Sequence, residues 1–128
     1  SGADDVVPVP GAHSVADSLT VEAPRAARLC LRRIREADGA AVTVTDDEIL
    51  AAIPDLAGST GVFAEPAAAA ALAGLRMALG EGIVGASDET VLLVTGSGLK
   101  DVAAAASAIV RPDPIGPTLE SVMARLGM

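Results

Sequence analysis

Apolar residues recur along this chain at two spacings, which separate expected helices from expected strands. Recurrence every three to four residues predicts helices, and short β-branched or continuously apolar runs predict strands. The predicted helices span residues 24–37, 45–54 or a turn beyond, 64–79, 100–110 and 118–126, and the predicted strands span 40–44 and 88–94. The second strand is nearly continuous in apolar residues, which is typical of a strand covered on both faces.

This order of elements favours an α/β fold. Two strands with helices between them predict part of a parallel sheet, with helices layered on both sides. Two strands alone make a marginal sheet. We therefore expect a fragment of a three-layer α/β/α domain with few parallel strands, or a domain that obtains further strands from elsewhere.

Polar residues mark where two of the helices begin. Thr45 and Glu48 have the spacing of a capping box, in which each side chain accepts a hydrogen bond from the other residue's backbone. Asp46 and Asp47 then fall in the first helical turn, where the helix dipole favours acids. These acids thus have a structural explanation, and a metal site is disfavoured. Thr118 is expected to cap the last helix.

Composition and charge exclude some classes of partner. About half of the 128 residues are hydrophobic, but alanine dominates and Phe63 is the only aromatic residue, so helices must pack closely. Either a partner surface completes this core or the composition reflects a general alanine bias. The net charge of −8 argues against nucleic-acid and anionic-membrane partners. The basic residues gather once, at the expected solvent face of the first helix: Arg25, Arg28, Arg32, Arg33 and Arg35.

The single cysteine and the first residues bear on the compartment. Cys30 is alone, so no disulfide forms within the chain, which fits a reducing compartment such as the cytoplasm. No apolar run approaches the length of a membrane span. The first eleven residues, SGADDVVPVPG, have neither the basic nor the hydrophobic region of a secretory signal peptide, and none is expected.

The stretch VLLVTGSGLKD (91–101) resembles a phosphate-binding turn only superficially. Lys100 does not follow a glycine at the spacing of a P-loop, and Asp101 stands where a dinucleotide fingerprint needs its third glycine. An acid there would also repel a pyrophosphate at a helix N-terminus. A plain tight turn is the simplest alternative. His13 and Cys30 are single residues of their kinds, and the residues suggest neither a catalytic triad nor a metal site.

Three stretches in order resemble the threonine synthase group of fold-type II pyridoxal-phosphate enzymes. They are SVADSLTVEAPR (14–25), TDDEILAAIPDLAGSTGVFAEPAAAAALAGL (45–75) and DETVLLVTGSGLKD (88–101). The resemblance covers residues 14–110 and matches only the C-terminal portion of the family. It implies that residues 22–110 are the C-terminal part of the large domain. The residues themselves indicate an extended lead-in over 1–21, which has few periodic signals, and a Pro-rich linker with a terminal helix over 111–128.

The resemblance also implies what the chain lacks. The Schiff-base lysine and the glycine-rich loop for the cofactor phosphate lie upstream in such enzymes, and Lys100 matches a different family lysine. No catalytic residue is therefore expected in this chain. We expect a piece of a longer lyase, inactive by itself and not binding pyridoxal phosphate alone, whose partners are the rest of the enzyme and, in a homodimer, a second copy.

Four residues are implied to line the cofactor site. Thr95 matches the hydroxyl residue that meets the pyridine nitrogen; it is a neutral partner that moderates the electron sink. Gly96 lets the backbone pass close to the ring. Glu65 and Ala67 match a stretch lining the same cavity, although both also suit an ordinary helix start. Asp17 is a weaker candidate for the cleft.

The implied reaction is conversion of O-phosphohomoserine to threonine and phosphate. Ser97 departs from the His or Asn common in the threonine synthase version, and this departure bears on the substrate. A threonine dehydratase, a cysteate synthase and a non-catalytic α/β interaction module therefore remain alternatives. A small nucleotide-binding domain is a further alternative, for which bound nucleotide would have to raise the melting temperature.

Overall fold

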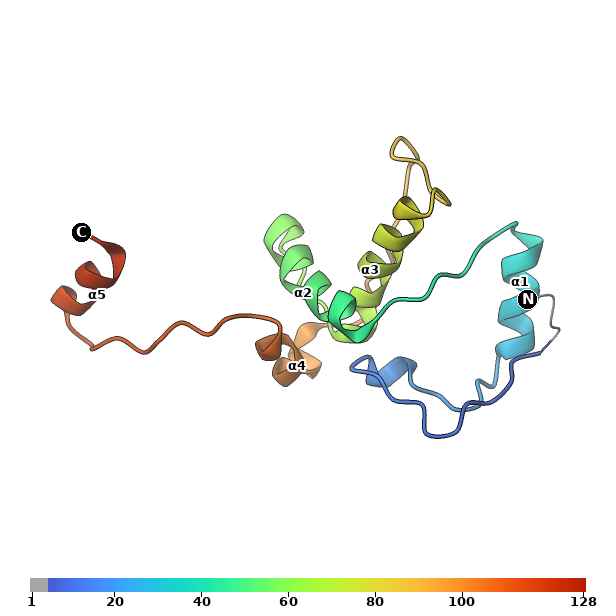
Figure 1. Cartoon of the computed structure of the whole chain (residues 1–128), viewed down its shortest axis with the longest axis horizontal. Coiled ribbons are helices and arrows are strands. Elements are labelled where there is room, and N and C mark those ends of the chain that lie inside the picture. The colour runs from blue at the N-terminus through green and yellow to red at the C-terminus, as the bar shows by residue number, and fades with distance from the viewer. Residues whose placement is uncertain (1–4) are drawn as a thin grey trace.

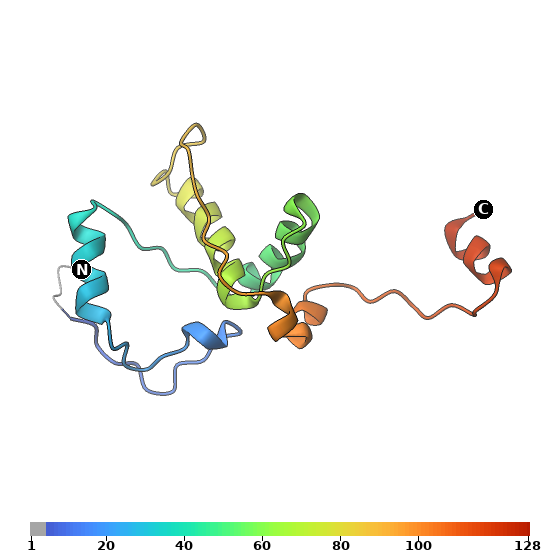
Figure 2. The same ribbon diagram turned by 180° about the vertical axis from the view of Figure 1, so that it is seen from behind.

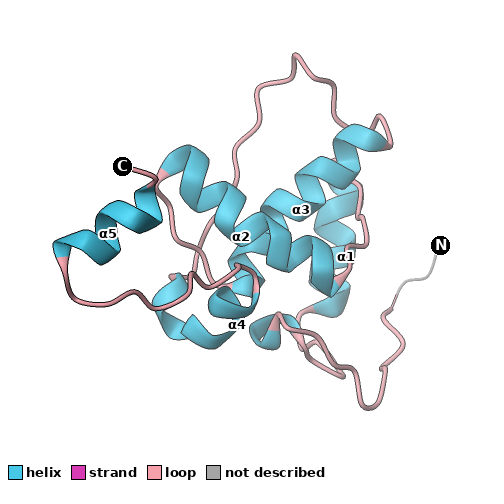
Figure 3. Cartoon of the chain, turned by 60° about the vertical axis from the view of Figure 1, so that its left-hand side comes forward, coloured by secondary structure: helices cyan, strands magenta, loops and turns pink. Residues whose placement is uncertain are grey.

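The computed structural model describes residues 5–128, and their regular structure is helical (Figures 1 and 3). The elements are η1 (Asp17–Leu19), α1 (Ala27–Glu36), α2 (Asp46–Thr60), α3 (Pro66–Gly80), η2 (Gly98–Lys100), α4 (Val102–Ser107) and α5 (Leu119–Leu126). Figure 1 shows α2 and α3 diverging from a shared end, with α4 beside that end and α1 and α5 far out on opposite sides.

The capping box at α2 is confirmed. The Glu48 backbone N–H donates to Thr45 Oγ1 at 3.3 Å, and the Thr45 backbone N–H donates to Glu48 Oε2 at 2.7 Å. The helix continues past Pro54 to Thr60 and stops at Gly61, whose φ of 75° is left-handed. The helix therefore ends later than the predicted end at residue 54 or a turn beyond. Thr118 caps α5 as predicted, since its side chain accepts from the Ser121 N–H.

The capping box predicts a specific loss of stability in acid. Hydrogen bonds from the backbone and then the hydroxyl of Thr45 hold the pKa of Glu48 below its ordinary value of 4.5. A lowered carboxyl pKa stabilises the folded chain above the unfolded pKa, and this contribution disappears as the pH falls through the folded value. Replacing Glu48 with Gln should therefore reduce the difference in urea midpoint between pH about 6 and about 3. An unchanged difference would contradict this assignment.

The core lies between α2 and α3 and is built largely from alanine. α2 contributes Ile49, Ala52, Ile53 and Leu56, and these pack on small residues at the start of α3 and just before it: Ala64, Ala68, Ala69 and Ala73. Small side chains let the helix backbones approach closely. α4 packs on α2, and η1 on α3. The buried positions that α3 contributes to this core are therefore alanines.

The outer helices α1 and α5 bury no residue. The five arginines at and before α1 are exposed, as expected for a solvated face. Arg28 pairs with Asp5 at 2.6 Å, and this hydrogen bond lowers the pKa of Asp5 although both groups lie in water. Such an exposed pair contributes little stability. α1 begins at Ala27, three residues after its predicted start, and α4 is shorter than the helix predicted over 100–110.

The two predicted strands do not form within the described residues. Residues 41–45 and 89–95 are extended but belong to no ladder. The one β-bridge among residues 5–128 pairs Ala64 with Ser97, outside both segments. A strand is completed by a neighbour's hydrogen bonds, and neither segment has such a neighbour in this part of the chain. A sheet is therefore not confirmed within residues 5–128.

Each extended segment is covered on one side only. Val44 and Val94 pack against the core, and Val42 lies beside Gly74 of α3. In contrast, Val91 is 81% exposed and Leu93 is 74% exposed. Figure 2 shows the segment that contains them running along α3. The expectation that residues 88–94 are buried on both faces is therefore wrong for this part of the protein.

Within residues 5–128, none of the helices combines the length and the apolar character that crossing a bilayer requires.

Candidate functional site

The glycine-rich turn is held against the N-terminus of α3. The Glu65 backbone N–H donates to the Gly96 carbonyl at 3.0 Å, and the Gly98 N–H donates to the Phe63 carbonyl at 2.9 Å. These antiparallel bonds join segments far apart in sequence. They place the turn beside the Glu-Pro-Ala stretch that the sequence pointed to.

Both glycines of the turn are needed for space. A Cβ on Gly96 would overlap the carboxylate of Glu65, and a Cβ on Gly98 would lie 2.5 Å from the ring of Phe63. Neither residue has a positive φ, so backbone freedom is not the reason. Gly96 was expected to permit a close approach, and in this structure the group that approaches it is Glu65.

The Glu65 carboxylate is buried and paired. Its side chain is 11% exposed, and Lys100 Nζ donates to Glu65 Oε1 at 3.0 Å. Lys100 is the only lysine of the chain, yet the sequence analysis gave it no structural role. That the chain has a single lysine was the only signal for such a role in the sequence. The partner of Lys100, Glu65, lies 35 residues away, and local sequence patterns do not reveal so distant a contact.

A cavity of about 220 Å³ opens beside this ion pair. Glu65 and Ala67 line it from the start of α3, and Lys100 and Asp101 line it from the turn after Gly98. Asp17 and Ser18 of η1 form part of the opposite wall. The structure thus brings together two predicted cofactor-binding residues and the weaker candidate Asp17.

The other two predicted site residues lie next to the cavity rather than in its lining. Thr95 is exposed, and its hydroxyl has no hydrogen-bond partner among residues 5–128. Gly96 is buried behind Glu65. Ser97 caps η2 by accepting from the Leu99 N–H at 3.3 Å, and Asp101 caps α4 by accepting from the Ala104 N–H at 2.9 Å. Asp101, the acid that disfavours a phosphate-binding turn, is therefore the N-cap of α4.

Asp46 does not line the cavity but anchors the segment that leads to Asp17 and Ser18. Its carboxylate accepts from Ser14 Oγ at 2.6 Å and from the Val15 N–H at 3.2 Å. These bonds fix the segment that leads into η1 and so place Asp17 and Ser18. The sequence predicted the first-turn position of Asp46 but not this contact.

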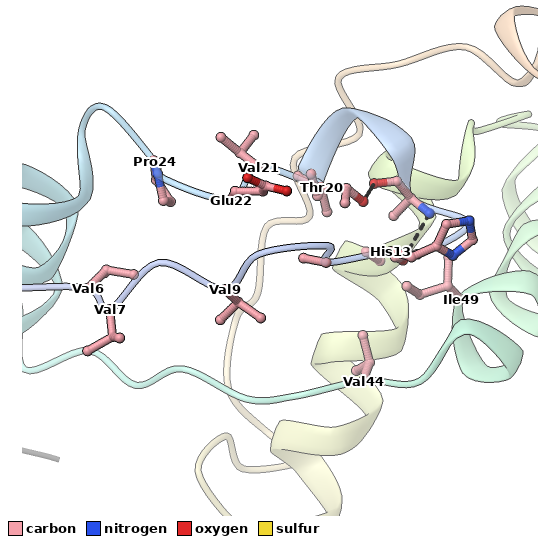
Figure 4. A pocket seen from close by; sticks show the side chains of 15 residues that line it. Val6, Val7, Val9, His13, Thr20, Val21, Glu22, Pro24, Val44 and Ile49 are labelled. Carbon is pink, nitrogen blue, oxygen red and sulfur yellow. Dashed lines mark hydrogen bonds between the residues drawn. The ribbon is translucent and has the colours of Figure 1, made fainter.

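A second, mostly apolar groove of about 390 Å³ lies where the lead-in passes α2 and α3 (Figure 4). Valines of the lead-in face it, and Figure 4 shows Val9 and Val44 on facing segments. His13 lies at this groove rather than at the cavity of Glu65. In residues 5–128, no three His, Cys, Asp or Glu side chains cluster so as to hold a metal ion.

Comparison with known proteins defines the class. Residues 1–96 match the family described as "Pyridoxal-phosphate dependent enzyme". The chain therefore belongs to the family of pyridoxal-phosphate-dependent enzymes, whose cofactor is pyridoxal phosphate.

The relatives found by sequence similarity include three threonine synthases. The chain is 36% identical to that of Methanosarcina acetivorans over 122 residues, which are 95% of this chain and 30% of the relative. It is 38% identical to that of Methanocaldococcus jannaschii over 110 residues, covering 86% of this chain and 27% of the relative. It is 34% identical to that of Mycobacterium tuberculosis over 123 residues, 94% of this chain and 34% of the relative. The chain thus spans about a third of the length of these relatives.

The residues present fit one end of the cofactor. The unpartnered Thr95 hydroxyl is a neutral group able to donate to a pyridine nitrogen. Beside Gly96, the space that a side chain would need is taken by the Glu65 carboxylate. Lys100, by contrast, is paired with the Glu65 carboxylate at 3.0 Å.

Proposed function

We propose that this chain is the C-terminal portion of a threonine synthase, the lyase that converts O-phosphohomoserine to threonine and phosphate. The observation that carries the proposal is the similarity to threonine synthases along nearly the whole chain. The arrangement of the turn supports it, because an unpartnered Thr95 hydroxyl precedes a glycine held at the start of α3.

In this proposal, each residue of the site has a limited role. Bound pyridoxal phosphate supplies the electron sink for elimination at the β and γ carbons of the substrate. Thr95 would hydrogen-bond the ring nitrogen as a neutral partner, and Gly96 would admit the edge of the ring. Glu65 and Ala67 would line the cavity on the α3 side. The Schiff-base lysine and the phosphate loop would come from the rest of the protein.

The fold of the whole protein is part of the same proposal. Residues 40–44 and 88–94 would become parallel strands of a three-layer α/β/α domain. Their exposed backbone and the exposure of Val91 and Leu93 support this. The proposed divisions are a lead-in (1–21), the large-domain portion (22–110) and a linker with terminal helix (111–128). A homodimer in the cytoplasm remains the expected form.

A genetic and chemical assay tests the proposed activity. The full-length gene containing this sequence should restore growth without threonine to a bacterial strain that lacks threonine synthase. The purified protein should release phosphate and threonine from O-phosphohomoserine in equal amounts. Formation of 2-oxobutyrate from threonine would indicate a dehydratase, formation of cysteate from O-phosphoserine and sulfite a cysteate synthase, and binding without turnover an interaction module.

Substitution at Thr95 tests its assigned role. Thr95→Val in the full-length protein should weaken binding of pyridoxal phosphate about two- to tenfold, because one neutral hydrogen bond is lost. Thr95→Ser keeps the hydroxyl and should bind nearly as the native protein does. Equilibrium titration by absorbance measures both. Equal binding by all three proteins would remove Thr95 from the site.

A further inference from the structure

The pair formed by Lys100 and Glu65 differs from the Arg28–Asp5 and Arg76–Asp55 pairs in the burial of its carboxylate, while the Lys100 side chain remains 61% exposed. The Arg28–Asp5 and Arg76–Asp55 pairs have side chains at least half exposed. Glu65 is only 11% exposed, and its carboxylate is pressed against Gly96. A carboxylate removed from water needs a partner, and Lys100 is the one that the structure provides.

The surroundings of the pair make Lys100 unusual in a second way. Three carboxylates line the cavity, those of Asp17, Glu65 and Asp101, and Lys100 is the one cation among the lining residues. Without its ammonium group, this wall would carry only negative charge. Charge on a buried carboxylate such as that of Glu65 acts more strongly on a neighbouring ionisable group than charge in bulk water does.

We infer that Lys100 is a positioning residue that keeps the Glu65 carboxylate charge-paired against Gly96, so that Thr95 offers the cofactor ring nitrogen a neutral hydroxyl without an uncompensated anion behind it. This inference rests on the proposed function. Glu65 adjoins the residue that follows Thr95, so an unpaired carboxylate there would attract a proton to the ring nitrogen. A protonated ring is a stronger electron sink. Lys100 therefore sets the electronic character that the Thr95 hydroxyl allows.

Three variants of the full-length protein test the inference. Lys100→Met removes the charge and keeps the length, Lys100→Arg keeps the charge, and Lys100→Met with Glu65→Gln removes both charges. The probe is pyridoxal phosphate labelled with nitrogen-15 in the ring, whose NMR frequency reports protonation. Arg76→Met is the control, because it breaks an exposed ion pair between α3 and α2 that lies away from the turn.

The expected pattern distinguishes charge from simple packing. Lys100→Met should shift the ring-nitrogen resonance toward that of a protonated pyridine, Lys100→Arg and Arg76→Met should leave it in place, and the double variant should return it. A resonance unmoved in Lys100→Met, or still moved in the double variant, would overturn the inference. Native protein that binds no pyridoxal phosphate would instead refute the proposed function.

A measurement without cofactor covers the case in which a variant folds poorly. In cofactor-free protein, Lys100→Met should lower the melting temperature, and adding Glu65→Gln should recover part of the loss because the buried charge is gone. If the double variant melts no higher than Lys100→Met, the two residues are not coupled and the inference fails.

Discussion

Replacing Gly96 with Ala should detach the glycine-rich turn from α3. The new Cβ would overlap the Glu65 carboxylate, which must then rotate away from Lys100. Overpacking of this kind costs about 1–3 kcal/mol of unfolding free energy. In the full-length protein, we also expect loss of most pyridoxal-phosphate binding. The displaced Glu65 carboxylate would move into the space beside Gly96 in which the proposal places the edge of the cofactor ring. Urea unfolding and absorbance titration measure the two effects.

Gly58→Ala is the matched control for this experiment. Gly58 lies inside α2, its φ is not in the left-handed region, and nothing stands within 4 Å of an added Cβ. Alanine at such a helical position should be neutral or stabilise by up to about 1 kcal/mol. Equal effects of the two substitutions would show that the close approach of Glu65 to Gly96 has no energetic consequence.

Truncating Ile53 to Ala should produce the largest loss of stability among core substitutions. Ile53 is 2% exposed and lies on the face of α2 that packs against α3. The core around it is mostly alanine, so few long side chains are present to fill the space left behind. Removing three buried carbons in such a setting costs about 2–5 kcal/mol.

Two further variants bracket that expectation. Ile53→Val removes one carbon and should cost about 0.5–1.5 kcal/mol. Leu119→Ala removes a side chain that is 74% exposed on α5 and should change stability by less than about 0.5 kcal/mol. The urea midpoint should therefore be lowest for Ile53→Ala, higher for Ile53→Val and highest for Leu119→Ala. An Ile53→Ala midpoint equal to that of Leu119→Ala would mean that the α2–α3 core is not formed in solution.

Helix boundaries were predictable where their causes are local. The capping box of Thr45 and Glu48 and the cap at Thr118 lie within three residues of the backbone groups that they satisfy. The strands were not, because a strand depends on a partner that the local sequence does not name. Residues 40–44 and 88–94 have strand composition but lack such a partner among residues 5–128.

In the candidate site, too, the sequence predicted the local features but not the contacts between distant segments. Motifs pointed to Glu65, Ala67 and the glycine turn, and the structure places these side by side. The motifs did not reveal which groups touch. That Lys100 neutralises Glu65 depends on contacts between segments distant in sequence. The hydrogen bond from Ser14 to Asp46, which anchors the segment of the opposite wall, likewise joins segments distant in sequence.

The one-sided cover of residues 89–95 has a consequence for anyone who produces this chain separately. Val91 and Leu93 stand in water next to backbone groups with no ladder partner, which is the chemistry of an adhesive edge. Such an exposed edge can form backbone hydrogen bonds with a strand of another chain. We therefore expect the chain, when it is produced alone, to self-associate through this edge, which light scattering over a range of concentrations would detect.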